Sequence, residues 1–146
     1  MAYATATNVT DSYQSTLLAQ LTADSGSSIT DAIITAEAAE QSLMMDSYFI
    51  GRYEIPITGP TSVLNVLQPH CIRLTLAGLF QRRLMLESYP SVAKDKEDTM
   101  EWLKAIQKGT SSLAGAATTV LVDPTDSVTD IGGTEPRVYN EDAGLL

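Results

Sequence analysis

The stretch DSYFIGRYEIP, residues 46–56, ends one apolar helix and redirects the chain toward the next. Gly51 stands where a helix prefers a left-handed C′ residue, and Pro56 cannot continue a helix. A helix stop explains the glycine and the proline, but it does not explain Arg52 and Tyr53. We therefore expect these two residues to contact a neighbouring subunit.

The segment before this stop, residues 30–50, has the apolar spacing of a helix. Thr30 is the expected N-cap, and Asp31 follows in the first turn, where the helix dipole favours a negative charge. Alanine and methionine, which are frequent here, are strong helix formers. The residues at helical spacing are Ile33, Ile34, Glu37, Ala38, Gln41, Met44, Met45, Tyr48 and Phe49.

An earlier helix is expected over about residues 10–22, with Asn8 or Thr10 as its cap. Its apolar positions recur at helical spacing, and DSGSS (24–28) reads as the turn that follows. The apolar positions are Tyr13, Leu17, Leu18 and Leu21.

Residues 62 to about 87 are apolar over most of a helical surface, which predicts a central helix buried on several sides. Pro69 either kinks this helix or splits it after Gln68. The apolar residues are Val63, Leu64, Leu67, Ile72, Leu74, Leu76, Leu79, Phe80, Leu84 and Met85.

A last helix is expected over residues 92–108, with Ser91 as its cap and Gly109 as its stop. The pair Tyr89 and Pro90 closes the helix before it. The inward positions are Met100, Leu103 and Ile106.

Residues 110–146 differ in composition, because they are rich in Thr, Gly, Ala, Asp and Pro, with one short β-prone run at 118–122. The predicted fold class is therefore mostly α: a small bundle of about four helices with an extended C-terminal arm. We expect residues 1–109 to form the helical domain and 110–146 to form the arm. Apolar anchors stand near its end, in PRVYN and in GLL.

The single cysteine, Cys71, excludes an internal disulfide and fits a reducing cytoplasm. The N-terminus lacks the basic residues and apolar stretch of a signal peptide. We also expect no apolar run of membrane-spanning length and no membrane association.

The net charge of −9 argues against tight, non-specific binding of nucleic acid. Residues 1–51 hold six acids and no base, residues 52–109 hold six acids and eight bases, and residues 110–146 hold six acids and one base. This distribution serves solubility, or it lets an acidic face meet the basic middle of a neighbouring subunit or repel a polyanion.

The candidate catalytic residues do not combine into a site. His70 and Cys71 are adjacent, so their side chains diverge by about 100° on a helix and cannot form a nucleophile–base pair. One histidine and one cysteine cannot assemble a usual zinc site. Glu37 and Glu40 share a helical face without metal-ligand partners. We therefore expect no cofactor, no metal and no enzymatic activity.

Two basic features remain. Arg82 and Arg83 form a doublet at a helix end, which fits a solvated cap better than a nucleic-acid contact. Arg73 interrupts the most apolar helix, so it must be paired or reach water. Glu37, Glu40 or Asp46 on the preceding helix could pair with it; alternatively, it faces another subunit.

The chain resembles the phage Mu-like head–tail joining proteins in several motifs. These are the opening MAYAT, the helix that ends in DSYFIGRYEIPI, the Arg82–Arg83 doublet, Tyr89, EWLKAIQKG at 101–109, and Leu113. The resemblance covers about residues 1–113, with a weaker echo in PRVYN.

The resemblance implies a non-enzymatic virion protein, made in the host cytoplasm, that forms a ring, usually a dodecamer, below the portal. Such an adaptor extends the DNA channel and docks the tail or neck completion protein, and DNA passes without specific binding. Expected subunit or portal contacts are Arg52, Tyr53, Arg73, Arg82, Arg83, Arg137, Val138, Tyr139, Leu145 and Leu146. Expected channel-facing acids are Asp11, Asp24, Asp31, Asp123, Asp126 and Asp130.

Two other functions stay open from the residues alone. A small helical regulatory or DNA-binding protein would use the third and fourth predicted helices as a helix-turn-helix, but the sparse Lys and Arg oppose it. An enzyme subunit whose site is completed by a partner is the second.

Overall fold

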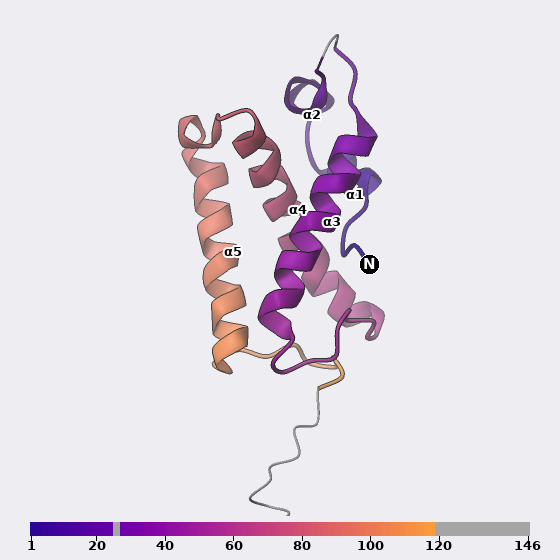
Figure 1. Ribbon diagram of the computed structural model, residues 1–146, viewed down its shortest axis with the longest axis vertical. Helices are drawn as coiled ribbons and strands as arrows, with labels where there is room; N and C mark the ends of the chain where they lie inside the picture. The colour runs from indigo at the N-terminus through magenta and orange to yellow at the C-terminus, as the bar shows by residue number, and fades with distance from the viewer. Residues whose placement is uncertain (25–26, 119–146) are drawn as a thin grey trace, which may run out of the picture.

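The computed structural model describes residues 1–24 and 27–118, and helices dominate it (Figure 1). The expected mostly helical fold is confirmed. In that part of the chain the extended pairing is one isolated antiparallel bridge, between Tyr53 and Thr118. The β-prone residues 119–122 lie outside the described residues. The elements are α1 (Ala6–Ser12), α2 (Ser15–Thr22), α3 (Asp31–Phe49), α4 (Thr61–Arg82), the 3-10 helix η1 (Leu86–Ser88) and α5 (Pro90–Lys108).

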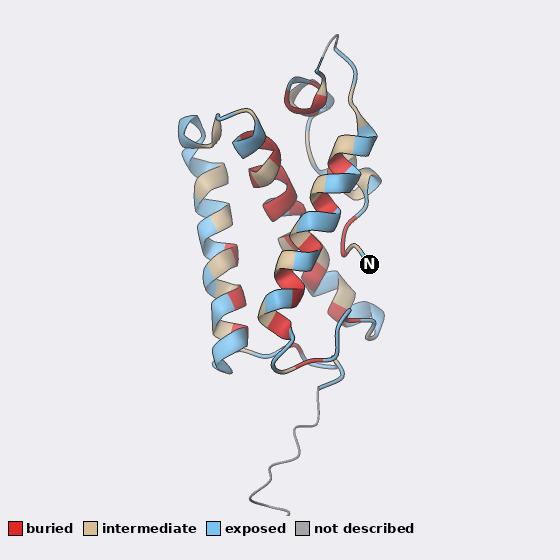
Figure 2. Cartoon of the chain, viewed as in Figure 1, coloured by how far each residue is buried: buried red, intermediate tan, exposed pale blue. Residues whose placement is uncertain are grey.

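Helix α4 is the centre of the fold, as the apolar pattern predicts. It packs against α1, α2, α3 and α5, and Figure 2 shows buried residues along it. By length and composition alone α4 could also cross a membrane, so the expectation that no apolar run reaches that length was wrong. A buried core helix meets the same criteria. The buried residues of α4 are Val63, Leu67, Cys71, Ile72, Leu74, Thr75, Leu76, Ala77, Leu79 and Phe80.

The first predicted helix is two helices, because the backbone is extended at Tyr13. The expected caps were also wrong. Thr5 caps α1, and its Oγ1 accepts from the N–H of Asn8 at 3.2 Å while its own N–H donates to Asn8 Oδ1 at 2.8 Å. Asn8 is therefore the third helical residue of a capping box. Short polar side chains compete for backbone groups, which favours caps and turns over helix interiors.

Helix α3 ends without the left-handed glycine that the sequence predicts. Gly51 does not have a positive φ. The carbonyl of Phe49 instead accepts from the N–H groups of Arg52 and Tyr53, at 2.8 and 2.9 Å. Because the chain turns back onto its own last carbonyl, no left-handed residue is needed here.

Two prolines of the second half bear on the expected helix limits, and for Pro69 the structure excludes the split after Gln68. Pro69 lies inside α4, which continues through it as one helix. Pro90 is the first residue of α5, with Tyr89 as the N-cap residue, so Ser91 is not the cap. Proline suits this position because a first-turn N–H has no helical acceptor. Gly109 ends α5 with φ 86°, as predicted.

The N-terminal segment is fastened to α3 by buried polar groups. The Tyr3 hydroxyl donates to Asp46 and accepts from the N–H of Ile57 at 2.9 Å, and the N–H of Tyr3 donates to Ser42 Oγ at 2.9 Å. Burial, together with the Asp46 carboxylate, raises the pKa of Tyr3 above its usual range. Tyr3 thus links α3 to the connection that leads into α4.

Helix α4 ends at Arg82 rather than near residue 87, in a Schellman motif. The N–H of Met85 donates to the carbonyl of Phe80, and the N–H of Leu84 donates to that of Gln81, both at 2.9 Å. The motif requires a C′ residue in the left-handed conformation, which is usually glycine. Here the C′ residue is Leu84, with φ 57°. Leu84 was expected to point inward, but it is 92% exposed. The backbone of Leu84 is therefore in a conformation that disfavours a Cβ, and its apolar side chain is exposed to water.

Leu84→Gly should raise the free energy of unfolding by about 0.5–1 kcal/mol, because glycine accepts the left-handed conformation and the exposed side chain loses no burial. Chemical denaturation followed by circular dichroism measures this change. Leu84→Ala, which keeps a Cβ at positive φ, is the control and should show less of the gain. A destabilised glycine variant would contradict the conformational argument.

Candidate interaction residues

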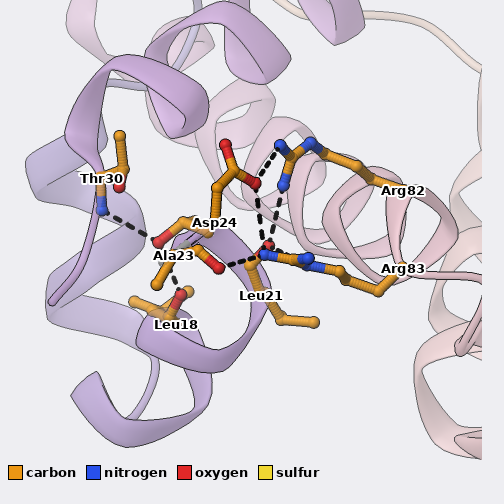
Figure 3. Close-up of polar contacts among 8 residues, drawn as sticks. Leu18, Leu21, Ala23, Asp24, Thr30, Arg82 and Arg83 are labelled. Atoms are coloured by element: carbon orange, nitrogen blue, oxygen red, sulfur yellow. Dashed lines mark hydrogen bonds and ion pairs between the residues drawn. The ribbon is translucent and has the colours of Figure 1, made fainter. Parts of the chain in front are cut away.

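Arg82 and Arg83 reach from the end of α4 to the end of α2 (Figure 3). The carbonyl of Leu21 accepts from Arg82 Nη1 at 3.3 Å and from Arg83 Nε at 3.1 Å. Arg83 Nη2 also donates to the carbonyl of Ala23. Asp24 Oδ1 lies 2.8 Å from Arg82 Nη2 and 3.5 Å from Arg83 Nη2. We call this group the α2 clamp.

The α2 clamp provides hydrogen-bond donors for the carbonyls at the C-terminal end of α2. The last carbonyls of a helix have no partner within the helix, and positive charge is favourable beside them. Two guanidinium groups supply charge-assisted donors to these carbonyls. The hydrogen bond from Arg82 also lowers the pKa of Asp24. Thr22 adds a second tie, because its Oγ1 accepts from the N–H of Thr30 at 3.0 Å.

The arginine doublet was expected at a solvated helix end and in a subunit contact. The structure places it in an intramolecular clamp, which corrects the solvated-cap interpretation. The acceptors of the clamp are mainly backbone carbonyls that lie 60 to 62 residues earlier in the chain. Every residue has a backbone carbonyl, so the sequence does not indicate which carbonyls accept hydrogen bonds from Arg82 and Arg83.

Arg52 caps a second helix end in the same way. Its Nη1 donates to the carbonyl of Ile106, in the last turn of α5, at 2.9 Å and to that of Ser111, just beyond the helix, at 3.2 Å. The guanidinium also lies over the Tyr53 ring, 5.7 Å from its centroid. A Cβ at Gly109 would lie 3.3 Å from Arg52 Nη1, so glycine there leaves room for the cap.

Tyr53 holds the segment that follows α5 against the bundle. It is 3% exposed, its hydroxyl accepts from the N–H of Leu113 at 2.9 Å, and its ring meets Phe49 edge to face. Leu113 is itself buried. Residues 110–118 therefore pack on the helices, and both Arg52 and Tyr53 have an intramolecular role.

Arg73 is exposed on α4. Among the described residues it forms no ion pair within 4 Å, which excludes the alternative in which it pairs with an acid of α3. Asp46 is bonded to Tyr3, and Glu37 accepts from Gln41 at 2.7 Å. The alternative, that Arg73 faces another subunit, stays a prediction.

The expected channel-facing acids are only partly described. Asp11 and Asp31 are exposed at the end of α1 and the start of α3, whereas Asp24 belongs to the α2 clamp. The other expected residues lie outside the described residues: Asp123, Asp126, Asp130, Arg137, Val138, Tyr139, Leu145 and Leu146.

His70 and Cys71 point into different surroundings. The His70 ring stacks on Trp102 with 3.8 Å between ring centroids, and its Nδ1 lies 3.4 Å from Thr99 Oγ1. Cys71 is fully buried, with its sulfur 3.4 Å from Ser42 Oγ, and burial raises its pKa. The two side chains therefore do not work as a pair. In the part of the chain that the structure describes, no three His, Cys, Asp or Glu side chains are grouped to hold a metal.

Replacing Arg83 with Met keeps the aliphatic stem and removes the donors to Leu21 and Ala23. We expect a loss of about 1–2 kcal/mol in the free energy of unfolding, together with faster hydrogen exchange of the α2 amides. Arg73→Met, an exposed arginine on the same helix, is the matched control and should change neither quantity by much. Equal effects of the two substitutions would contradict the clamp.

His70 should titrate below its ordinary pKa of 6.5, because burial and the charge of Arg73 disfavour its protonated form. A lowered folded-state pKa means that the unfolded chain takes up the proton first, so stability falls as the pH drops from about 6.5 toward the folded pKa. Carboxylates titrate below this window. His70→Gln should remove this part of the pH dependence, and an NMR titration measures the pKa directly. A value at or above 6.5 would contradict the burial argument.

A comparison with protein-family models matches residues 3–129 to the family described as "Bacteriophage Mu, Gp36". The match spans every helix in the part of the chain that the structure describes. A search of the curated proteins returned no match.

Proposed function

We propose that this chain, which belongs to the bacteriophage Mu Gp36 family, is a head–tail connector adaptor that forms a ring below the portal. Family membership makes it a phage structural or morphogenesis protein. The observation that carries the finer proposal is the extent of the match, residues 3–129, together with the motifs that resemble head–tail joining proteins. In this role the ring extends the DNA channel and docks the tail or neck completion protein.

The internal contacts support a subunit that enters an assembly as a preformed block. The α2 clamp fixes the end of α2, Arg52 fixes the end of α5, and Tyr3 fixes the N-terminal segment. A block with its helix ends tied down loses little conformational freedom when it packs beside a neighbour. Neighbouring copies and the portal protein are the proposed partners.

The charges support passage of DNA without tight binding. The chain carries −9 overall, and three of the eight bases in residues 52–109 donate to carbonyl groups of their own chain. Binding to the phosphate backbone depends on free Lys and Arg. Exposed acids such as Asp11 and Asp31 would repel DNA that moves past them.

Mass measurement of the purified chain, alone and mixed with portal rings of its phage, tests this proposal. We expect a complex in which several copies of the chain sit on each portal ring, and no shift of duplex DNA by the free chain. Portal rings alone and the chain alone are the controls.

A chain that stays monomeric and never binds portal rings would contradict the adaptor role. A shift of duplex DNA that weakens as salt rises would favour the regulatory, DNA-binding function instead.

A further inference from the structure

Helix α3 has a solvent-exposed side that carries little charge. Leu43 is 66% exposed, and Ile50, directly after the helix, is 61% exposed. The exposed side of a surface helix usually carries polar and charged residues, and exposed apolar patches mark interaction sites. We call this side the α3 outer face, and its residues, all exposed, are Ala36, Ala39, Glu40, Leu43, Ser47 and Ile50.

Helix α4 has an exposed side in its first half. Val66 is 45% exposed there, and Arg73 carries the charge of this side. We call it the α4 outer face, and its exposed residues are Ser62, Val66, Pro69 and Arg73. A pocket of about 370 Å³ lies beside Val66, and its lining residues are uncharged: Ser62, Val63, Val66, Ser112, Leu113 and Ala114.

The two outer faces point in opposite directions at the same level of the bundle. Helices α3 and α4 meet at Cys71, whose sulfur lies 3.4 Å from Ser42 Oγ and 3.8 Å from the carbonyl oxygen of Ala38. Glu40 lies two residues from each of these α3 partners, and Arg73 lies two residues from Cys71. Because a helix turns 100° per residue, two residues place a side chain about 160° away from the contact. Glu40 and Arg73 therefore project from opposite sides of the α3–α4 pair.

Charge makes the two faces complementary. Helix α3 contains acids and no base, whereas α4 contains arginines and no acid. Neither Glu40 nor Arg73 forms an ion pair within the described part of the chain. Asp95 of α5 shares the surroundings of Tyr13 with Arg73, but it does not pair with Arg73 within 4 Å. An acid of a neighbouring copy can therefore pair with Arg73.

We propose that the α3 outer face of one copy packs against the α4 outer face of the next, with Glu40 paired to Arg73. The inference rests on the ring of the proposed function and identifies its lateral contact. Helices α3 and α4 run in opposite directions (Figure 1). A copy placed beside the first at equal height therefore brings its Leu43 between Val66 and Pro69. Its Ile50 then lies toward the pocket beside Val66.

The pairing of two different faces fits a ring. After two copies join, one α3 outer face and one α4 outer face remain free for the next copies. Such a contact repeats around an axis and closes when the rotation between neighbours permits.

Other occupants fit these faces less well. Two α3 outer faces packed together would bring acids near one another without a base, which opposes binding. They would also cover each other and stop at a dimer. Residues 119–146, with six acids and one base, are the alternative partner of the α4 outer face. In that arrangement Leu43 and Ile50 would stay in water.

Charge reversal in the full-length chain tests the pairing. Glu40→Arg and Arg73→Glu each bring like charges together, so each should weaken assembly on portal rings about tenfold or more. The double variant restores opposite charges and should recover assembly. Glu97→Arg, an exposed reversal on α5, is the matched control and should assemble like the wild-type chain. Denaturation curves like that of the wild-type chain verify that each variant folds.

Undiminished assembly of both single variants overturns the lateral contact and leaves the adaptor role standing. A double variant that assembles no better than Arg73→Glu alone also overturns it, because Arg73 would then have a partner other than Glu40, such as residues 119–146.

Cysteine trapping tests the contact without the portal. Full-length Leu43→Cys is mixed with full-length Val66→Cys at high concentration under a mild oxidant, and the native Cys71 is fully buried and should not react. We expect a mixed disulfide, whereas Leu84→Cys, at a position that is 92% exposed, should not join to Val66→Cys. An equal yield from the Leu84 pair, or Leu43→Cys joined mainly to itself, overturns the proposal. A mixed disulfide from a chain that never binds portal rings would support the contact and contradict the adaptor role.

Discussion

The burial of α4 is the constraint on which the rest of the structure depends. This helix is apolar on most sides, so one neighbouring helix cannot cover it. Helices α1, α2, α3 and α5 share the task. Two of them, α1 and α2, are too short to be stable by themselves. They depend on α4 for a surface to pack on. The unpaired backbone groups at their ends depend on side chains from other parts of the chain.

Arginine side chains supply many of the hydrogen-bond donors at these helix ends. Arg82 and Arg83 leave the end of α4 and hold the end of α2, while Arg52 leaves the end of α3 and holds the end of α5. In both places a guanidinium donates charge-assisted hydrogen bonds to carbonyls at or just beyond a helix end. The same helices that cover α4 are thereby fixed relative to one another. Positive charge that could have served an interaction outside the chain is directed inward at these positions.

The sequence predicted what depends on local pattern and missed what depends on distant contacts. Apolar periodicity gave the long helices α3, α4 and α5, and Gly109 marked the end of α5. The break at Tyr13 was missed because Leu17 and Leu18 continue the spacing across it. Gly51 looked like a left-handed cap, but the carbonyl of Phe49 is satisfied by amides that follow it. The roles of Arg52, Arg82 and Arg83 were missed because backbone carbonyls accept their hydrogen bonds. The family match confirms the phage Mu-like part of the resemblance drawn from DSYFIGRYEIP and EWLKAIQKG.

A side-chain-resolution electron cryomicroscopy structure of the chain assembled on its portal tests the central claim most directly. The account predicts that Arg82 and Arg83 still hold Leu21, Ala23 and Asp24 of their own chain. A structure in which these arginines leave their own α2 to bind another subunit would contradict it.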